Sequence, residues 1–320
     1  MTNVIVTENL IKNFGPKRVV DHLSLKIPEG CVYGFLGRNG AGKSTTIRML
    51  MGMVRPDYGR IELLGEDLAT LRPETRARIA YIAEGHPLYG SLRVSEMVAF
   101  ARSFYPHWNK DLVQRILDHF ELSPRQRVRR LSRGQQAQVS LAIAMGPDPE
   151  LLILDDPTLG LVTVVRRDFL ESLIQIIQRR GRTILFSSHV LGDVERVATR
   201  IGIMDRGVLR VDCPTEHFRE TLRKVVCEFR GQPPDYPGEL PPLKGVVSAR
   251  VVGTTLELLI VGYGPEHEAA LQALEPRFLE AVELNLEDAF IEYTRGPRRP
   301  IPLFFEETRH VEGDLVERLA

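Results

Sequence analysis

A glycine-rich segment between an apolar run and a helical stretch constrains this chain more than any other feature. It follows the run Val32–Leu36, opens a helical stretch that continues through Met51, and reads Gly37-Arg38-Asn39-Gly40-Ala41-Gly42-Lys43-Ser44. In this context the pattern is that of a P-loop, in which glycines let backbone N–H groups turn toward phosphate oxygens at a helix N-terminus. A glycine-rich turn without a ligand is the alternative interpretation. We assign nucleotide binding to Gly37, Asn39, Gly40, Gly42, Lys43, Ser44 and Thr45.

Particular roles follow for two of these residues and for a pair of acids further along the chain. Lys43 is expected to reach the β- and γ-phosphates, and Ser44 is expected to hold Mg²⁺. The apolar run Leu151–Leu154 ends in Asp155 and Asp156, and ligands of parallel sheets bind at the carboxyl ends of the strands. We therefore expect Asp155 to bind the Mg²⁺, directly or through water, and Asp156 to polarise the attacking water. Without the P-loop, the acid pair would be a solvated turn.

A histidine follows another apolar run. Thr183–Phe186 is succeeded by Ser187-Ser188-His189, so His189 is placed at the same edge of the predicted sheet. There it could donate a hydrogen bond to the γ-phosphate, whereas the alternative is a structural histidine. The catalytic residues predicted from sequence are accordingly Lys43, Asp156 and His189.

Short apolar runs alternate with longer amphipathic stretches in the first two thirds of the chain, which predicts an α/β domain with a largely parallel, buried sheet. The runs are Val32–Leu36, Ile79–Ala83, Leu151–Leu154 and Thr183–Phe186. Alternation at Val4–Ile11 and Val19–Ile27 predicts antiparallel strands before that core. Helical spacing at Val94–Phe104 and Leu112–Phe120 predicts a helical insert at about residues 85–135.

The pattern changes from Arg223 onward, and a small α+β domain is predicted there. Its expected strands are Val225–Phe229, Val246–Val252 and Thr255–Val261, with a helix at Glu266–Leu274 and a proline-rich loop at Gly231–Pro242. The predicted divisions of the chain are residues 1–221, residues 222–296 and a tail at residues 297–320. The tail is either a docking segment or disordered.

Composition and charge limit the classes of function. Lysine plus arginine equals aspartate plus glutamate, at 42 each, so no global charge points to nucleic acid or to an anionic membrane surface. The cysteines Cys31, Cys213 and Cys227 match no zinc or redox spacing, which fits a reducing compartment. We find neither a signal peptide nor an uninterrupted apolar run of about 18 residues. A soluble, cytoplasmic protein is therefore expected.

The order of these motifs resembles that of the nucleotide-binding subunits of ATP-binding cassette (ABC) transporters, over roughly residues 1 to 220. The most specific segment is Leu131-Ser132-Arg133-Gly134-Gln135, which resembles the family signature Leu-Ser-Gly-Gly-Gln. The resemblance implies that Ser132, Gly134 and Gln135 reach across a dimer to the partner's γ-phosphate, with a helix N-terminus again serving as the anion site. It also implies that Phe14 stacks on adenine, for which a core position is the alternative, and that His189 is the switch histidine.

A second resemblance lies near the end of the chain. Residues 282–293, which include Leu286-Glu287-Asp288-Ala289-Phe290, resemble the close of the extension found in drug, antibiotic and lipid exporter subunits. Together the resemblances imply a P-loop NTPase of the ABC cassette fold, with an antiparallel β subdomain, a helical insert and a small α+β C-terminal domain. They imply ATP and Mg²⁺ as cofactors, and a separate integral membrane permease and a second nucleotide-binding subunit, as a homodimer, as partners. The protein would then lie on the inner face of the cell membrane through its permease.

Four residues depart from the family pattern, namely Glu84 for glutamine, Asp156 for glutamate, Val162 for aspartate and Arg133 for glycine. Glu84 remains able to ligand Mg²⁺. The Asp156 carboxylate should sit roughly 1 to 1.5 Å further back, and misplacement by about 1 Å can lower a rate on the order of a hundredfold, so slow hydrolysis is expected. Val162 cannot form the hydrogen bond through which the aspartate links the two nucleotide sites.

Three functions are compatible with these motifs. The leading interpretation is an ATPase subunit that powers an exporter, in which residues His86-Pro87-Leu88-Tyr89 and the helix at Val94 are candidates for the permease contact. The second is an ATP-dependent dimerisation switch with little hydrolysis, which Asp156 and Val162 favour. The third is the branch of the superfamily that acts on ribosomes or DNA. Because that branch commonly has two cassettes or a long coiled coil, which we do not find, we expect no nucleic-acid partner.

Overall fold

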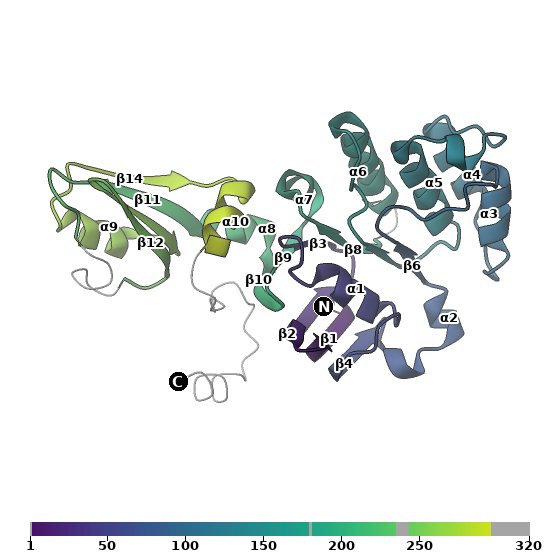
Figure 1. Ribbon diagram of the computed structural model, residues 1–320, viewed down its shortest axis with the longest axis horizontal. Helices are drawn as coiled ribbons and strands as arrows, with labels where there is room; N and C mark the ends of the chain where they lie inside the picture. The colour runs from purple at the N-terminus through teal and green to yellow at the C-terminus, as the bar shows by residue number, and fades with distance from the viewer. Residues whose placement is uncertain (1, 179–180, 235–242, 296–320) are drawn as a thin grey trace. The chain divides into compact units, whose positions relative to one another are not determined.

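The computed structural model of the protein describes residues 2–178, 181–234 and 243–295 (Figure 1). It contains two compact units, which divide between Leu209 and Arg210. The boundary expected from sequence, between residues 221 and 222, lies after this division, at the start of strand β11 (Leu222–Glu228). The predicted tail at residues 297–320 lies outside the described residues, as do residues 235–242 of the predicted proline-rich loop.

The first unit is built on a six-stranded sheet with the strand order β10-β9-β3-β8-β7-β6, whose edge strand β10 continues into the second unit. Its strands are β3 (Val32–Leu36), β6 (Ile79–Ile82), β7 (Leu151–Leu154), β8 (Thr183–Ser188), β9 (Arg200–Asp205) and β10 (Val208–Pro214). The pairs β3 with β8, β3 with β9, β7 with β8, and β6 with β7 are all parallel. Their carboxyl ends therefore lie along one edge of the sheet, which is where parallel sheets bind ligands.

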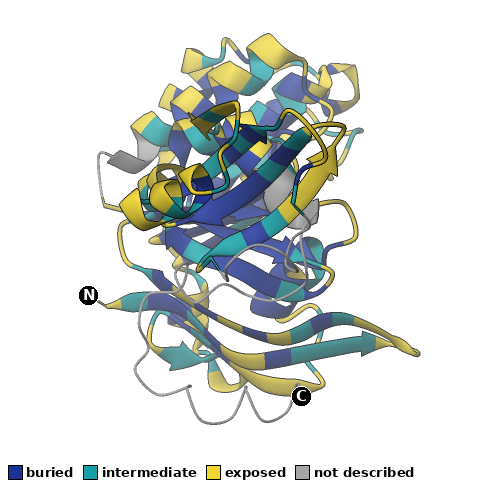
Figure 2. Ribbon diagram, turned by 90° about the vertical axis from the view of Figure 1, so that its left-hand side faces the viewer, coloured by how far each residue is buried: buried dark blue, intermediate teal, exposed yellow. Residues whose placement is uncertain are grey.

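The strands at the centre of this sheet are continuous apolar runs because both faces are covered. Every residue of β3, β7 and β8 is buried, as is typical of parallel sheets flanked by helices. Figure 2 shows buried residues mainly along strands and exposed residues mainly on the outer faces of helices and in loops. In Figure 1, α1 (Lys43–Leu50) lies on one side of the sheet, and α6 (Thr163–Gln178) and α7 (Leu191–Val197) lie on the other. The four apolar runs selected from sequence are thus confirmed as strands of one largely parallel sheet.

A second sheet of the same unit is antiparallel, as the alternating pattern predicts. Its order is β2-β1-β4-β5, and its strands are β1 (Asn3–Phe14), β2 (Lys17–Pro28), β4 (Tyr58–Leu63) and β5 (Glu66–Asp67). The inward positions Ile5, Leu10, Leu23 and Ile27 are fully buried. Helix α1 contacts β2, so it links the two sheets. A 3-10 turn (Leu68–Thr70) and the short α2 (Pro73–Arg76) lead to β6.

The predicted insert is helical. It contains α3 (Val94–Arg102), α4 (Lys110–His119), a 3-10 turn (Val128–Arg130) and α5 (Arg133–Met145). Helix α4 shows the predicted spacing plainly, because Val113, Ile116 and Leu117 are its buried residues. Helix α5 contacts α4, α3 and β6, which fixes the insert to the edge of the central sheet.

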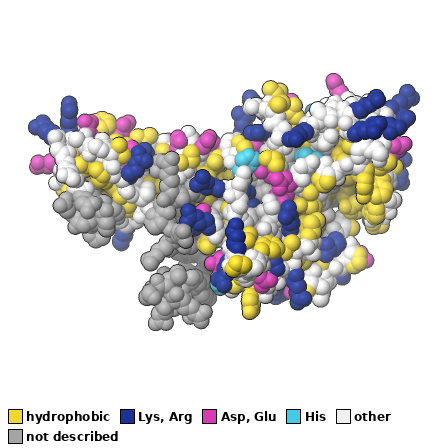
Figure 3. All heavy atoms as spheres, in the orientation of Figure 1, with side chains coloured by type: hydrophobic (Ala, Val, Ile, Leu, Met, Phe, Trp, Pro, Cys, Tyr) yellow, Lys and Arg dark blue, Asp and Glu magenta, His cyan; other side chains and the backbone are white. Residues whose placement is uncertain are grey.

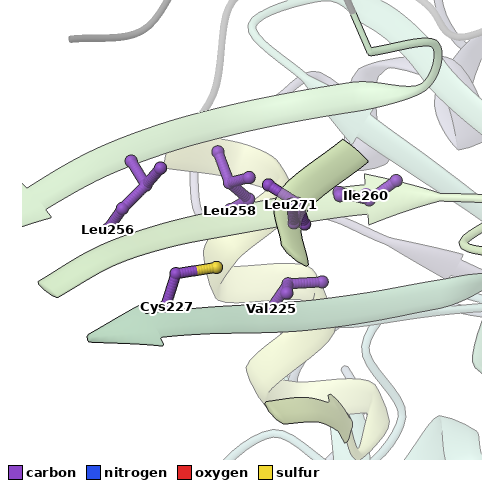
Figure 4. Close-up of a cluster of buried hydrophobic side chains, with 6 residues drawn as sticks. All are labelled: Val225, Cys227, Leu256, Leu258, Ile260 and Leu271. Carbon is purple, nitrogen blue, oxygen red and sulfur yellow. The ribbon is translucent and has the colours of Figure 1, made fainter. Parts of the chain in front are cut away.

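The second unit is the small α+β domain expected from sequence. After α8 (Thr215–Thr221), four antiparallel strands pair in the order β12-β13-β11-β14. Strands β12 (Val246–Val252), β13 (Thr255–Val261) and β14 (Phe278–Glu283) accompany β11, with helices α9 (Pro265–Gln272) and α10 (Leu286–Arg295). One face of the sheet packs on α9 around Val225, Cys227, Leu256, Leu258, Ile260 and Leu271 (Figure 4). Cys227 thus lies in an apolar core, and burial raises the pKa of its thiol to about 11.

Candidate functional site

The residues selected for catalysis lie in the segments that follow three neighbouring strands. The glycine-rich loop follows β3, the acid pair follows β7, and His189 follows β8. Because β8 pairs in parallel with both β3 and β7, the three strand ends are adjacent. The topology therefore brings the glycine-rich loop together with segments that lie more than a hundred residues further along the sequence.

The glycine-rich loop is held too closely by its surroundings to accept side chains at two positions. Gly37 and Gly42 have φ angles of 157° and 112°. A Cβ atom would lie 2.4 Å from the Met204 carbonyl oxygen if it were added at Gly37, and 2.6 Å from the Val19 carbonyl oxygen if it were added at Gly42. Gly42 is also the N-cap of α1. Because glycine has no side chain that could cap the helix, the first N–H groups of α1 remain open to a ligand.

Lys43 is buried at the start of α1 and points back into the loop. Its Nζ donates hydrogen bonds to the carbonyl oxygens of Gly37 at 2.7 Å and Arg38 at 3.2 Å. Burial lowers the pKa of this ammonium group, and the carboxylates of Asp156, Asp155 and Glu84 oppose that shift. The ammonium group of Lys43 is therefore held by the loop within electrostatic reach of the acids, where it can neutralise the charge of bound phosphates.

Asp155 has a free oxygen at the point where a divalent cation would be held. Its Oδ1 accepts hydrogen bonds from Ser44 Oγ and from Ser187 Oγ, each at 2.9 Å. Its Oδ2 is buried and has no hydrogen-bond partner. A buried carboxylate oxygen without a partner is unfavourable, and a hydroxyl and a carboxylate are the oxygen ligands that Mg²⁺ prefers. The residues therefore fit the predicted cation.

Asp156 is held in an uncommon backbone conformation. Its φ angle is 44°, in the left-handed region, and it precedes Pro157, which restricts the preceding residue further. Such a residue stores on the order of 1–3 kcal/mol of strain and persists only where its surroundings fix it. Its backbone N–H donates to Ser187 Oγ at 2.9 Å, and its Oδ2 lies 2.6 Å from His189 Nδ1. Asp156 Oδ1 has no partner, so one oxygen remains available to a water molecule.

Sequence reasoning missed the role of Ser187. Its hydroxyl donates to Asp155 and accepts from the Asp156 backbone, so it connects the two acids. The parallel pairing of β7 with β8 was the signal that could have identified it, because the pairing places the ends of the two strands side by side. A buried serine is otherwise uninformative in a single sequence.

A hydrogen bond between two buried residues, Thr158 and Asp193, holds the turn after Asp156 in place. Thr158 Oγ1 donates to Asp193 Oδ2 at 2.9 Å, and Arg166 Nε lies 3.7 Å from the same oxygen. Burial raises the pKa of the Asp193 carboxyl, whereas the hydrogen bond from Thr158 opposes the shift. Asp193 lies in the first turn of α7, so this contact attaches the turn to the helix that follows the predicted catalytic histidine.

His86 requires a correction. The interpretation that it forms part of a partner-facing surface is wrong, because its side chain is buried with 5% exposure. Its Nε2 lies 2.9 Å from the Pro157 carbonyl oxygen, and its Nδ1 has no partner. Burial lowers the pKa of the imidazole. Pro87 and Tyr89 in the same segment are exposed.

The segment that resembles the signature motif forms a capped helix start. Ser132 is the N-cap of α5, and it exchanges hydrogen bonds with Gln135 in a capping box. Ser132 is exposed, whereas Gly134 is buried. A Cβ atom added at Gly134 would lie 2.5 Å from Val165 Cγ1, which explains the need for glycine there. Within the described chain, the hydrogen bonds of Ser132 are made with its own helix and not with the glycine-rich loop.

Phe14 and Glu84 lie at the periphery of the site. Phe14 ends β1 and is 52% exposed, so the alternative of a core aromatic is wrong. Lys12 Nζ lies 5.5 Å from its ring centroid. Glu84 is exposed after β6, and among the described residues it has no hydrogen bond or ion pair. Its influence on Lys43 is purely electrostatic, and its predicted role as a magnesium ligand stays a prediction.

Comparison with known proteins agrees with this geometry. The ABC transporter family model matches residues 20–159. The bacitracin transport ATP-binding protein BcrA of Bacillus licheniformis is 34% identical over 232 residues, which cover 72% of this chain and 76% of that protein. The chain belongs to the ATP-binding subunits of ABC transporters.

Further relatives support the assignment over more of the chain. The Nod factor export ATP-binding protein I of Paraburkholderia xenovorans is 33% identical over 290 residues, 88% of this ABC subunit and 94% of that protein. A solved ATP-binding subunit of an ABC transporter superposes with a TM-score of 0.61 at 26% identity, and covers 68% of this chain and 92% of that chain. The predicted cassette fold is therefore confirmed. Among the described residues, no helix of this ABC subunit is both long and apolar enough to cross a bilayer.

Proposed function

We propose that this ABC subunit binds Mg²⁺·ATP with Lys43, Ser44 and Asp155, and hydrolyses it with Asp156 as the group that polarises water. The observation that carries this proposal is the buried pair of unpartnered carboxylate oxygens, Asp155 Oδ2 and Asp156 Oδ1, beside the buried Lys43. A cation and a water molecule would supply the missing partners. His189 and Lys43 would then stabilise the charge of the transferred phosphoryl group.

The surface around the site favours closure by a second copy of the chain. Ser132 is exposed, and so are the apolar side chains of Leu159, Val162 and Val164, at 37%, 70% and 70%. Leu159 and Val162 follow the turn that carries Asp156, and Val164 lies at the start of α6. Exposed apolar side chains beside a catalytic turn are typical of a surface that is buried during the reaction cycle. We therefore propose a homodimer in which each Ser132 loop completes the other copy's nucleotide site.

An aromatic row on the helical insert is the proposed contact for a membrane permease. Tyr89, Phe100 and Phe104 are 59%, 41% and 69% exposed, and they form successive edge-to-face pairs with centroid distances of 5.3 and 5.1 Å. Hydrophobic side chains gather around α3 at the right of Figure 3. Exposed aromatic clusters of this kind are enriched in protein interfaces. The relatives BcrA and the Nod factor protein are named for bacitracin transport and Nod factor export, and on that basis we propose an exporter.

Capture of the full chain from native membranes tests this proposal. We expect an integral membrane protein to co-purify in a fixed ratio and to stimulate ATP turnover after solubilisation in detergent. The double substitution Tyr89→Ala and Phe104→Ala should abolish this recovery, whereas Phe278→Ala, which removes another exposed aromatic side chain, in β14, should not. Equal recovery with both variants would contradict the proposed contact, and capture without any membrane protein would contradict the transport role.

Slow hydrolysis follows from the short side chain of Asp156. Substitution Asp156→Glu extends the carboxylate by one methylene, and we expect it to raise the steady-state turnover of purified protein by about tenfold, since displacements of about 1 Å change rates by up to a hundredfold. Affinity for a fluorescent ATP analogue should stay within twofold of the unchanged protein, because the phosphate-binding residues are untouched. A turnover equal to or below that of the unchanged protein would contradict this explanation.

A second candidate function is a switch that dimerises on ATP with little hydrolysis. The exposed Val162 favours it, because a valine cannot make the hydrogen bond that links the two nucleotide sites. Partner-stimulated turnover separates the two functions. A switch shows none, whereas a transport subunit responds to its permease.

A further inference from the structure

His86 makes a buried contact that the proposed chemistry does not use. Its imidazole comes from the loop after β6 and lies beside the turn Asp156-Pro157-Thr158, which we call the 156–158 turn. Nε2 is 2.9 Å from the Pro157 carbonyl oxygen. Nδ1 is buried without a partner. The buried imidazole thus makes one hydrogen bond to the backbone, while its second nitrogen has lost its hydrogen bond to water without a replacement. An apolar side chain at this position would avoid that loss.

The chemistry of the two atoms fixes the direction of this hydrogen bond. A carbonyl oxygen has no proton to give, so Nε2 must carry the hydrogen and donate it. A proline residue has no N–H of its own, which leaves its carbonyl as the backbone group through which residue 157 can be held. The bond therefore acts on the backbone directly after Asp156.

The 156–158 turn is held from several elements, and His86 is the contribution of the loop after β6. Ser187 at the end of β8 accepts from the Asp156 N–H, and Asp193 of α7 accepts from Thr158. The left-handed φ of 44° at Asp156 needs such supports. Loss of one support should allow the turn to relax and so move the Asp156 carboxylate, without disturbing Lys43 or Ser44.

In the loop that carries His86, residues on both sides of the histidine are exposed to solvent. Glu84 and Tyr89 are exposed on either side of the buried imidazole, and Tyr89 begins the aromatic row proposed above as the permease contact. The hydrogen bond to Pro157 is thus a direct connection between that surface and the backbone of the catalytic turn.

We propose that His86 is a positioning residue for ATP hydrolysis, which ties the loop after β6 to the 156–158 turn and thereby aims the Asp156 carboxylate. This inference rests on the proposed hydrolytic function. It predicts that the position of the donor atom at residue 86, and not merely a polar side chain, sets the turnover number.

Two amide substitutions make a matched test. In His86→Gln the side-chain nitrogen reaches about as far as Nε2 of histidine, whereas in His86→Asn it reaches only about as far as Nδ1. Both variants are neutral and differ by one methylene. We expect His86→Asn to lower the turnover number of the purified full chain at least tenfold, by analogy with the rate loss for misplaced groups of about 1 Å. His86→Gln should retain turnover within about threefold, and both should bind a fluorescent ATP analogue within twofold of the unchanged protein.

The possible results distinguish a failure of the positioning role of His86 from a failure of the proposed hydrolytic function. A large loss of turnover in His86→Asn that is rescued in His86→Gln, at constant nucleotide affinity, supports the positioning role. Equal turnover of the two variants overturns it, as does a loss of turnover that merely follows a loss of affinity. If the unchanged protein shows no turnover at all, the hydrolytic function itself fails. His86→Leu gives an independent check on packing, since a residue that only fills space would tolerate leucine with full turnover.

Discussion

Substitution of Lys43 by alanine should lower the affinity for Mg²⁺·ATP by about a hundredfold or more. The buried ammonium group now donates to the carbonyl oxygens of Gly37 and Arg38 and would turn to the phosphates when nucleotide binds. Two charge-assisted hydrogen bonds contribute about 1.5–3 kcal/mol each, and about 2.8 kcal/mol corresponds to a hundredfold change in affinity. Isothermal titration calorimetry on the purified full chain, with and without Mg²⁺, measures the effect.

An exposed lysine provides the control for this experiment. Lys26 lies on the outward side of β2, so Lys26→Ala removes the same charge without touching the glycine-rich loop and should leave affinity unchanged. If Lys43→Ala bound Mg²⁺·ATP as tightly as Lys26→Ala, the assignment of the phosphate site to the loop after β3 would be wrong.

Replacement of Asp156 by asparagine should abolish most turnover while it preserves nucleotide binding. Asparagine keeps the size of the side chain but cannot polarise a water molecule as a carboxylate does, and loss of such a group lowers rates about 10²- to 10⁴-fold. The His189 contact at 2.6 Å can persist with the amide oxygen. ATP should therefore accumulate in an unhydrolysed dimer, which light scattering after size-exclusion chromatography detects as a doubled mass in the presence of Mg²⁺·ATP.

Asp168 supplies a matched carboxylate for comparison. It is exposed on α6, the helix that follows the 156–158 turn in the chain, and Asp168→Asn should retain both the turnover and the ATP-dependent change from monomer to dimer. A turnover number in Asp156→Asn within a few fold of that in Asp168→Asn would mean that another group activates the water.

Much of the cassette could be predicted because its strands are buried on both faces. Strands β3 and β7 end at the residues expected from sequence, since continuous apolar runs bounded by glycine or acidic residues leave little choice. Strands β12 and β13 of the second unit were located equally well by their alternation. The juxtaposition of Ser44 with Asp155 followed from a general property of parallel sheets, and the hydrogen bond of 2.9 Å confirms it.

The rest could not be predicted because it depends on contacts between distant segments. Strand β14 escaped notice because its residues are almost all exposed and carry no clear period. The burial of His86 depends on Pro157, and the buried Asp193 depends on Thr158, neither of which lies near its partner in the sequence. A histidine or aspartate in a polar segment looks solvated until the fold supplies the neighbour.

The hydroxyl of Ser187 couples the positions of Asp155 and Asp156, because it is hydrogen-bonded to both residues. It donates its single proton to Asp155 and accepts a hydrogen bond from the backbone N–H of Asp156, so any shift of the end of β8 moves the proposed cation ligand and the proposed water-activating residue together. If Asp155 holds Mg²⁺ as proposed, substitutions of Asp155 that change the metal preference should therefore also alter the rate constant of hydrolysis, even where the new metal binds well. A designer would have to treat the serine, both aspartates and the strand beneath them as one component.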